Sequence, residues 1–259
     1  MRRVAVKIAY LGKAYCGSQY QPELRTAIGD VLSDLQTVSG NRDIGWFNLK
    51  VASRTDAGVN ALENVIVFNT EFDDLDDMMR ALNSVSKGIF YRSVAEVDGS
   101  FNPRFADGRV YRYLLQSDGL DIRKVRDCAQ LFVGEHDFVR FCRLYDKSTV
   151  MTIDSIDVSE EDGHVVLVFK ARYFLWNMIR KITAAIASVA RGDRTEEDIR
   201  QALCGKDINF GLARPDALTL TEIIYDSVHF RTPTRKAYSE RVVEELFSDM
   251  IRNDFFRML

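Results

Sequence analysis

The stretch Ser53–Ala61, SRTDAGVNA, separates two apolar segments, 46–53 (WFNLKVAS) and 63–70 (ENVIVFNT), whose composition predicts β-strands. An aspartate followed by a small residue and a glycine is common turn chemistry, and structural turns far outnumber active sites. The alternative is that this turn holds a reactive carboxylate, Asp56, with Arg54 two residues before it. The residue types of the loop do not decide between these interpretations, so the rest of the chain has to.

Strands and helices are predicted to alternate around this loop. Residues 3–10 alternate apolar and polar side chains as a strand does, and residues 25–40 carry a helical apolar stripe that ends at Gly40. Residues 73–85 predict a second helix, and its four aspartates suit the positive end of the helix dipole better than a cation site. Residues 88–97 predict a further strand.

A second set of elements follows in a similar order. Strands are predicted at 109–116, 148–159, 164–172 and 220–230, and helices at 122–134, 174–192 and 196–203. Two successive sets predict an α+β fold of two halves that pack through their sheets. A change in composition near 100–108 places the N-terminal half, with the Asp56 loop, at 1–105 and the C-terminal half at 106–259.

The end of the chain, 239–259, is predicted to be an amphipathic helix. Its apolar stripe consists of Val242, Val243, Leu246, Phe247, Met250 and Ile251. We expect this stripe to pack on its own half, and a contact between two subunits is the alternative.

Composition and charge exclude several classes of protein. Of the 259 residues, 46% are hydrophobic and 28% charged, which is typical of a globular protein. No apolar run is long enough to span a bilayer and no cleavable signal precedes the first strand, which predicts a cytoplasmic protein. The net charge of −3 argues against indiscriminate DNA binding but is compatible with a local RNA-binding groove. The four cysteines and three histidines are scattered, so neither a metal site nor a disulfide framework is expected.

Two further side chains are candidates for chemistry. Arg180 lies in FLWNMIRKI, near the edge of a helical apolar stripe, where a surface arginine is the ordinary interpretation. If it is buried it needs an anionic partner from elsewhere in the fold, because no acidic residue is close in sequence. Tyr111 lies in RVYRYLLQ on the same strand face as Tyr113. Aromatic residues at this spacing usually pack in a core, although one flanked by arginines can also stack on a base.

Taken together, these segments resemble the TruA family of tRNA pseudouridine synthases. SRTDAGVNAL followed by ENVIVF resembles the signature loop of that family, an Arg-Thr-Asp-x-Gly-Val run that leads into a strand. Five further segments resemble the family in the same order along the chain, from residue 3 to about 230: AYLGKAYCGSQYQ, SFNPRFADGRVYRYLLQ, LFVGEHDFVRFCR, FLWNMIRKI and ARPDALTL. The Arg-Thr-Asp loop is specific, and the order of the weaker matches makes coincidence implausible.

The resemblance implies a fold, a reaction and a set of residues. The fold would be that of pseudouridine synthases, with two ferredoxin-like α+β halves whose sheets pack side by side around a central cleft. Asp56 would be the catalytic aspartate, Tyr111 the tyrosine that stacks on the target base, Arg180 the partner of the aspartate, and Arg54 the arginine associated with flipping the nucleotide. The reaction would isomerise uridine in the tRNA anticodon stem-loop, around nucleotides 38 to 40, without a cofactor or metal, in a homodimer. Six arginines are candidates for a basic cleft: Arg104, Arg109, Arg112, Arg140, Arg143 and Arg172.

Three positions depart from the family pattern. Asn60 stands where the family usually has histidine, Ser18 where an aromatic residue is common, and Ala217 where the C-terminal loop has glycine. The first two leave open a different target uridine, in tRNA or in another RNA. A non-catalytic RNA-binding protein on the same scaffold is a further alternative, although it would have no need to keep Asp56, Tyr111 and Arg180 together.

Overall fold

The computed structural model describes residues 1–143, 148–233, 241–242, 244–246 and 248–249. Within this part of the chain, eight strands form one mixed sheet in the order β4-β1-β3-β10-β5-β9-β8, with β2 paired to β3. The bounds of these strands are β1 (Arg2–Tyr10), β2 (Lys50–Val51), β3 (Asn60–Thr70), β4 (Phe90–Glu96), β5 (Gly108–Gln116), β8 (Ser155–Glu161), β9 (His164–Ala171) and β10 (Leu218–Ile224). A separate pair contains β6 (Gly134–Asp137) and β7 (Val150–Ile153).

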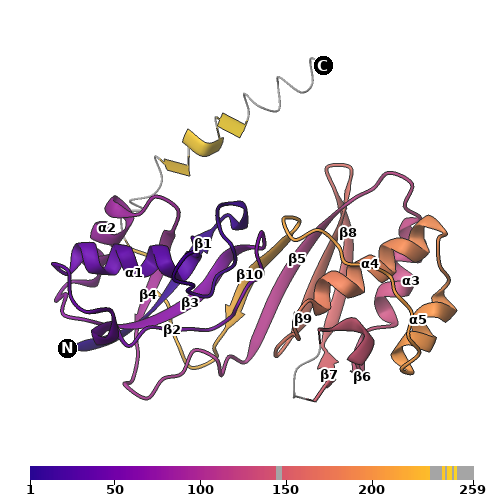
Figure 1. Cartoon of the computed structure of the whole chain (residues 1–259), viewed down its shortest axis with the longest axis horizontal. Coiled ribbons are helices and arrows are strands. Elements are labelled where there is room, and N and C mark those ends of the chain that lie inside the picture. Colours follow the sequence, from indigo (N-terminus) through magenta and orange to yellow (C-terminus); the bar gives the residue numbers. More distant parts are fainter. Residues whose placement is uncertain (144–147, 234–240, 243, 247, 250–259) are drawn as a thin grey trace.

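β10 joins the two predicted sets of strands. Its start runs parallel to the start of β3, where Thr219 pairs with Asn60, and its other edge runs antiparallel to β5. The α+β class predicted from the sequence is therefore confirmed, and the strands of both sets form one continuous sheet. Figure 1 shows the N-terminal strands on one side of β10 and the C-terminal strands on the other. The loop that contains Asp56 precedes β3 and so lies at this junction.

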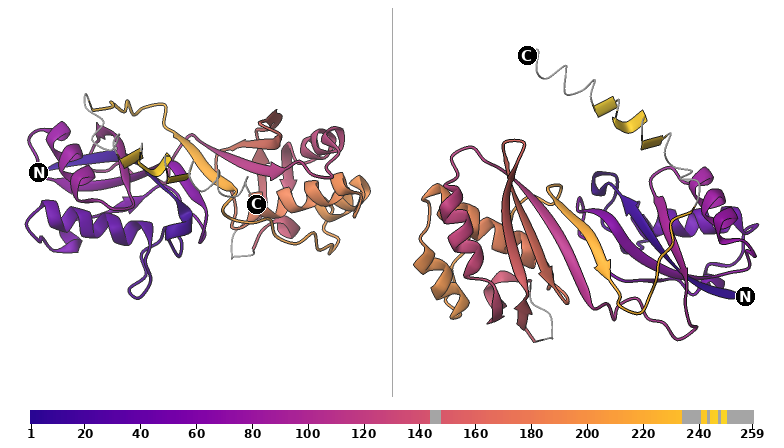
Figure 2. Two further views of the ribbon diagram at one scale, coloured as in Figure 1. Left: turned by 90° about the horizontal axis from the view of Figure 1, so that it is seen from above. Right: turned by 180° about the vertical axis from the view of Figure 1, so that it is seen from behind.

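Five α-helices in the described residues cover the sheet, and the N-terminus of α2 shows how a sequence signal begins a helix. Their bounds are α1 (Ala27–Val38), α2 (Leu75–Val85), α3 (Ile122–Gln130), α4 (Met178–Arg191) and α5 (Glu196–Leu203). The side chain of Asp74 accepts hydrogen bonds from the first amides of α2, and two more aspartates occupy its first turn. The acidic run therefore begins a helix, as predicted. α1 and α2 pack together in one half and α3 and α4 in the other, which gives the elongated outline in Figure 2.

Several predicted elements have different bounds in the structure. The strand predicted over 148–159 is two strands, β7 and β8, which lie in different sheets. In place of a strand over 46–53, a 3₁₀ helix, η2 (Ile44–Phe47), is followed by the short β2, because Asn48 adopts a left-handed backbone conformation with φ of 43°. The helix predicted over 174–192 begins only at Met178, since Asn177 has φ of 62°. The segment 172–177 is therefore non-helical, although its apolar residues continue the helical spacing.

The chain after β10 returns to the N-terminal half. Arg231 forms a β-bridge with Val94, with amide-to-carbonyl distances of 2.9 and 3.0 Å. Further along, the Arg241 guanidinium donates to the Ile89 carbonyl and lies 4.1 Å from the centre of the Phe90 ring. We expected the final helix to pack on the C-terminal half, but these described residues contact the N-terminal half. Most of its predicted apolar stripe (Val243, Phe247, Met250 and Ile251) lies outside the described residues.

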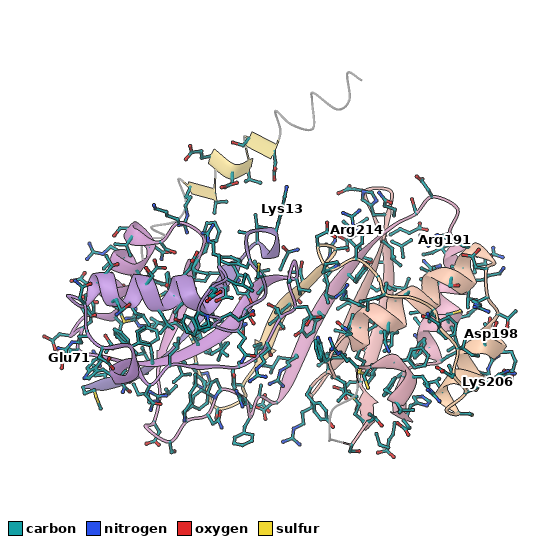
Figure 3. The ribbon with its side chains drawn as sticks, in the orientation of Figure 1. Lys13, Glu71, Arg191, Asp198, Lys206 and Arg214 are labelled. Atoms are coloured by element: carbon teal, nitrogen blue, oxygen red, sulfur yellow. The ribbon has the colours of Figure 1, made fainter. Side chains whose placement is uncertain are left out.

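One hydrophobic core continues through both halves. It includes Ile8 and Phe68 from the N-terminal strands and Phe132 and Ile186 from the C-terminal helices and their connections, all at most 1% exposed. Charged side chains such as Lys13, Lys206 and Arg214 lie on the outside (Figure 3). In the described part of the chain, no helix combines the length and the apolar character that crossing a membrane requires.

Candidate active site

Buried polar side chains form hydrogen bonds with the loop before β3 and fix its conformation. Ser18, which is fully buried, accepts a hydrogen bond from the Thr55 amide (2.8 Å) and donates its own amide to the Thr55 carbonyl (3.0 Å). The Tyr10 hydroxyl shares a hydrogen bond of 2.9 Å with the Thr55 hydroxyl. The buried side chain of Asn64 donates to the Ser53 carbonyl at 2.9 Å. Thr55 therefore faces the protein, and the residues on either side of it face outward.

A close contact at Gly58 and two hydrogen bonds of the Asn60 side chain shape the turn. Gly58 has φ of +83°, and a Cβ there would lie 3.0 Å from Pro215, so the turn needs a residue without a side chain. Asn60 accepts a hydrogen bond from the Gly12 amide and donates to the Asp216 carbonyl, each at 2.9 Å. The first loop, the Asp56 loop and the C-terminal loop are thus joined. The side chains of Ser18 and Asn60, two of the three departures from the family pattern, are engaged within the protein.

The Asp56 carboxylate contacts two side chains of the C-terminal half, Arg180 in the first turn of α4 and Trp176 just before that helix. Its Oδ2 lies 3.5 Å from Arg180 Nη1, and its Oδ1 accepts a hydrogen bond of 2.8 Å from the indole N–H of Trp176. The Asp56 side chain is 29% exposed and the Arg180 side chain 12% exposed. The half-buried arginine thus has the anionic partner that burial requires, and this partner comes from the other half of the chain.

Arg180 is held on its far side by the backbone of the C-terminal loop. Its Nε donates to the Ala213 carbonyl at 2.7 Å, and the Ala213 amide donates to the Arg180 carbonyl at 3.2 Å. Its Nη1 also lies 3.4 Å from the Asn177 side-chain oxygen. The guanidinium is fixed before any substrate binds, which favours a defined geometry for the ion pair.

Tyr111 projects from β5 beneath the loop. Its side chain is buried, and its ring meets the Phe174 ring edge-on with centroids 5.3 Å apart. Burial raises the pKa of the Tyr111 phenol above its ordinary value, and the nearby Arg109 guanidinium acts in the opposite direction. The hydroxyl is therefore protonated at neutral pH. Arg54 is exposed, and the structure shows no ion pair or hydrogen bond between its side chain and any described residue.

Trp176 is a site residue that the sequence reasoning did not identify. We assigned it to a continuous helix, in which an apolar residue between Leu175 and Asn177 has no special meaning. Its position beside Asp56 depends on the left-handed backbone of Asn177, because the helix begins only after that residue and Trp176 lies outside it. The sequence contained one signal that could have identified this residue: a tryptophan, whose side chain has one N–H donor, four residues before the candidate Arg180.

The six arginines proposed for a basic cleft have different environments. Arg109 is 7% exposed and donates to Ser53 Oγ (2.9 Å), to the Arg104 carbonyl (3.0 Å) and to the Arg172 carbonyl, so it is a structural residue and not part of an open cleft. Arg112 pairs with Glu161 at 2.8 Å and Arg140 with Asp207 at 3.3 Å. The remaining three, Arg104, Arg143 and Arg172, are exposed.

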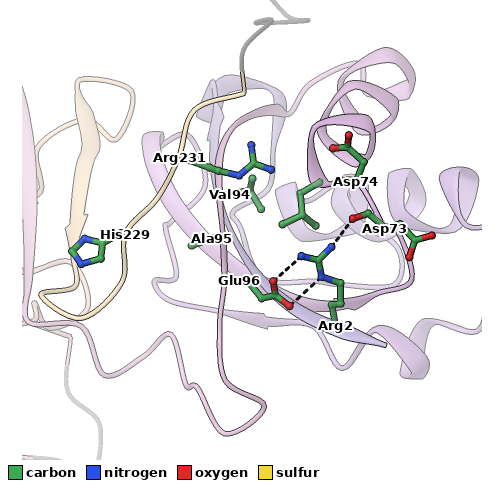
Figure 4. Close-up of a pocket in the computed structure, with 9 residues that line it drawn as sticks. Arg2, Asp73, Asp74, Val94, Ala95, Glu96, His229 and Arg231 are labelled. Carbon is green, nitrogen blue, oxygen red and sulfur yellow. Dashed lines mark hydrogen bonds and ion pairs between the residues drawn. The ribbon is translucent and has the colours of Figure 1, made fainter.

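In the described residues, no group of three or more His, Cys, Asp or Glu side chains is arranged to hold a metal ion. A pocket of about 350 Å³ lies far from Asp56, between β4, the start of α2 and the segment that returns after β10 (Figure 4). Arg2 crosses it and donates to Glu96 (2.7 Å) and to the Asp73 carbonyl (2.6 Å). None of the candidate site residues lines this pocket.

Comparisons with known proteins identify the family of this chain. A family model described as tRNA pseudouridine synthase matches residues 128–226, which include Trp176 and Arg180. Over nearly the whole chain, the protein is 38% identical to tRNA pseudouridine synthase A of Pyrococcus furiosus (97% of this chain, 98% of the relative) and of Pyrococcus abyssi (96% and 95%). The relative of the same name from Pyrococcus horikoshii is 38% identical over 88% of this chain and 87% of its own length. The protein therefore belongs to the tRNA pseudouridine synthase A family of enzymes.

Proposed function

We propose that the protein isomerises uridine to pseudouridine in tRNA with Asp56 as the catalytic carboxylate. One observation carries this assignment. The candidate aspartate, on a loop of the N-terminal half, is paired with Arg180 of α4 and hydrogen-bonded to Trp176, which lies just before α4 in the C-terminal half. A structural turn would have no need of a charge partner brought from so far along the chain.

The reaction requires a carboxylate and no external reactant. The bond between uracil N1 and the ribose breaks, the base turns, and C5 joins the ribose, so that all atoms are conserved. Three routes are open to the carboxylate: attack on the sugar carbon, attack on the base, or removal of a ribose proton. Each uses the charged carboxylate, and the Arg180 guanidinium beside it balances that charge in a partly desolvated site.

The neighbouring side chains suit the remaining steps. The target base must leave its stack before it reaches Asp56, at a cost of a few kcal/mol. Arg54, which is exposed beside Asp56, is placed to occupy the vacated space or to hold the backbone. The Tyr111 ring, fixed edge-on by Phe174, provides a platform for the extruded base. Its protonated hydroxyl is available for proton transfer.

An exposed aromatic and basic surface next to the loop suits RNA. The guanidinium of buried Arg109 donates to the carbonyls of Arg104 and Arg172 and to the Ser53 side chain. The segments 104–105 and 172–173 therefore lie close together, next to the loop. Each segment presents an arginine followed by an exposed aromatic: Phe105 is 77% exposed and Tyr173 is 43% exposed. Arginines beside aromatic rings bind phosphates and stack on unpaired bases.

Finer features of the proposal rest on the family resemblance. The target uridines would be in the anticodon stem-loop, around nucleotides 38 to 40, and the enzyme would be a cytoplasmic homodimer. The two halves, 1–105 and 106–259, would be ferredoxin-like units around a central cleft. The strand order supports this last point. When the strands of the large sheet are numbered along each half, β4-β1-β3-β2 and β10-β5-β9-β8 both become the order 4-1-3-2.

The test uses unmodified tRNA transcripts incubated with the protein without cofactors. New pseudouridines are then mapped to single nucleotides. The proposal expects modification within the anticodon stem-loop that is lost with Asp56→Asn, while tRNA binding by that variant persists. Modification elsewhere would revise the target alone. No modification of any tRNA would indicate a non-catalytic RNA-binding protein.

A further inference from the structure

Trp176 lies between the Asp56 carboxylate and an arginine. Its indole N–H donates to Asp56 Oδ1 at 2.8 Å, and the Arg143 guanidinium lies 4.0 Å from the centre of its rings. The Arg143 amide also donates to the Trp176 carbonyl at 2.8 Å. The indole is therefore fixed through its ring nitrogen, its ring face and its backbone.

The two oxygens of Asp56 are held by donors of different kinds. Arg180 lies 3.5 Å from Oδ2 and supplies positive charge, whereas the shorter contact, from Trp176 to Oδ1, is neutral and directional. Rotation of the carboxylate about its Cβ–Cγ bond would break the hydrogen bond to Trp176. The orientation of the carboxylate thus depends on the tryptophan, while its charge is balanced by the arginine.

Arg143 is placed to act on this hydrogen bond. A cation over the face of an indole is attracted by the ring electrons and makes the N–H a stronger donor. The segment before Arg143 is itself tied to α4, because Lys181 Nζ donates to the Cys142 carbonyl at 2.9 Å and to the Arg140 carbonyl at 3.3 Å. Both Arg143 and Trp176 are therefore anchored at the start of the helix that carries Arg180.

We propose that Trp176 is a positioning residue for Asp56 and that Arg143 acts through Trp176. The inference rests on the proposed function, in which Asp56 is the reactive group. Trp176 keeps one carboxylate oxygen fixed, so that the other side of the group is presented to the nucleotide in a single orientation. Arg143 strengthens that hold through the indole ring.

The hydrogen bond can be observed without any activity measurement. The chain has only two tryptophans, Trp46 and Trp176, so its indole N–H region in a ¹H–¹⁵N spectrum should contain two signals, which Trp46→Phe assigns. Asp56→Asn should shift the Trp176 signal, because a neutral acceptor replaces a charged one, and should leave the Trp46 signal in place. Arg143→Gln should also shift the Trp176 signal. An unmoved Trp176 signal in Asp56→Asn would overturn the proposal.

The effect on catalysis can be isolated to a single N–H group. In the Trp46→Phe background, Trp176 is replaced biosynthetically by benzothienylalanine, whose ring has nearly the same shape but carries sulfur in place of N–H. The single-turnover rate should fall roughly 10- to 100-fold, as expected for the loss of a hydrogen bond to a charged group, with tRNA affinity unchanged. Arg143→Gln should lower the rate by a smaller factor.

The chain supplies a matched control for the stacked pair. Arg42 lies 4.4 Å from the centre of the Trp46 ring, far from Asp56, so Arg42→Gln removes a similar contact and should leave the rate unchanged. A full rate with benzothienylalanine would overturn the positioning role while leaving Asp56 as the catalytic group. Full activity of Asp56→Asn would instead overturn the proposed function, whatever the tryptophan signals show.

Discussion

The ion pair between Asp56 and Arg180 is asymmetric. The arginine is 12% exposed and fixed by the Ala213 carbonyl, whereas the aspartate is 29% exposed. The cation is thus part of the scaffold, and the carboxylate is the member of the pair that a substrate can reach. This is the arrangement expected when the arginine serves the aspartate and does not itself contact a phosphate.

Replacing Arg180 with alanine should therefore reduce chemistry and not binding. We expect the single-turnover rate at saturating enzyme to fall roughly 100-fold, because the carboxylate loses its charge partner in a partly desolvated site. Adding Asp56→Ala to Arg180→Ala should cost far less than the two single changes combined, since residues that act as one unit are not additive. Weaker tRNA binding with an unchanged rate of the bound complex would mean that Arg180 contacts phosphate instead.

Arg109→Ala should make the protein less stable. The change removes hydrogen bonds to Ser53 Oγ and to the Arg104 carbonyl from a buried position, and we expect a loss of about 2–4 kcal/mol in the free energy of unfolding. Arg112→Ala, on the same strand, removes only an exposed pair with Glu161 and should cost less than about 1 kcal/mol. Urea titrations of both variants measure the difference. Equal stabilities would contradict the structural role of Arg109.

The sequence predicted part of the fold and of the candidate site, but it did not predict features such as the burial of Arg109. Local patterns predicted most of the strands, the acidic start of α2 and the turn that contains Asp56 and Gly58. They also required that a buried Arg180 have a distant anionic partner. They did not predict that Arg109 is buried or that Trp176 contacts Asp56, because a hydrogen bond between residues 120 positions apart leaves no periodic trace. The left-handed Asn177 was also hidden, since apolar spacing continued through it.

Phe105→Ala should weaken binding of tRNA. A large aromatic that is 77% exposed gains little from packing, and stacking on an unpaired base would supply about 1–3 kcal/mol, or roughly 5- to 150-fold in affinity. Phe105→Tyr should retain the affinity, because the ring is kept. Ile44→Ala is the control, an exposed apolar residue on η2. Titration of labelled tRNA in the Asp56→Asn background measures binding alone, and equal affinities for Phe105→Ala and Ile44→Ala would refute stacking at this position.

The last prediction concerns Asp34, a buried carboxyl on α1. Burial raises the pKa of Asp34, although Ser86 and Tyr91 offset part of this by hydrogen bonding, the Tyr91 hydroxyl at 2.8 Å. A carboxyl whose pKa is higher in the folded than in the unfolded state favours folding while it is protonated. That contribution is present below the unfolded value, about 3.9 for aspartate, and is lost as the pH rises through the folded value.

Asp34→Asn removes this dependence, since an amide does not titrate and its oxygen can still accept the hydrogen bond from Tyr91. The free energy of unfolding of the variant, relative to that of the unchanged protein, should therefore increase between about pH 4 and pH 7. Denaturant titrations at several pH values measure this difference. A relative stability of Asp34→Asn that decreases towards neutral pH would mean that the hydrogen bonds to the ionised carboxylate outweigh its burial.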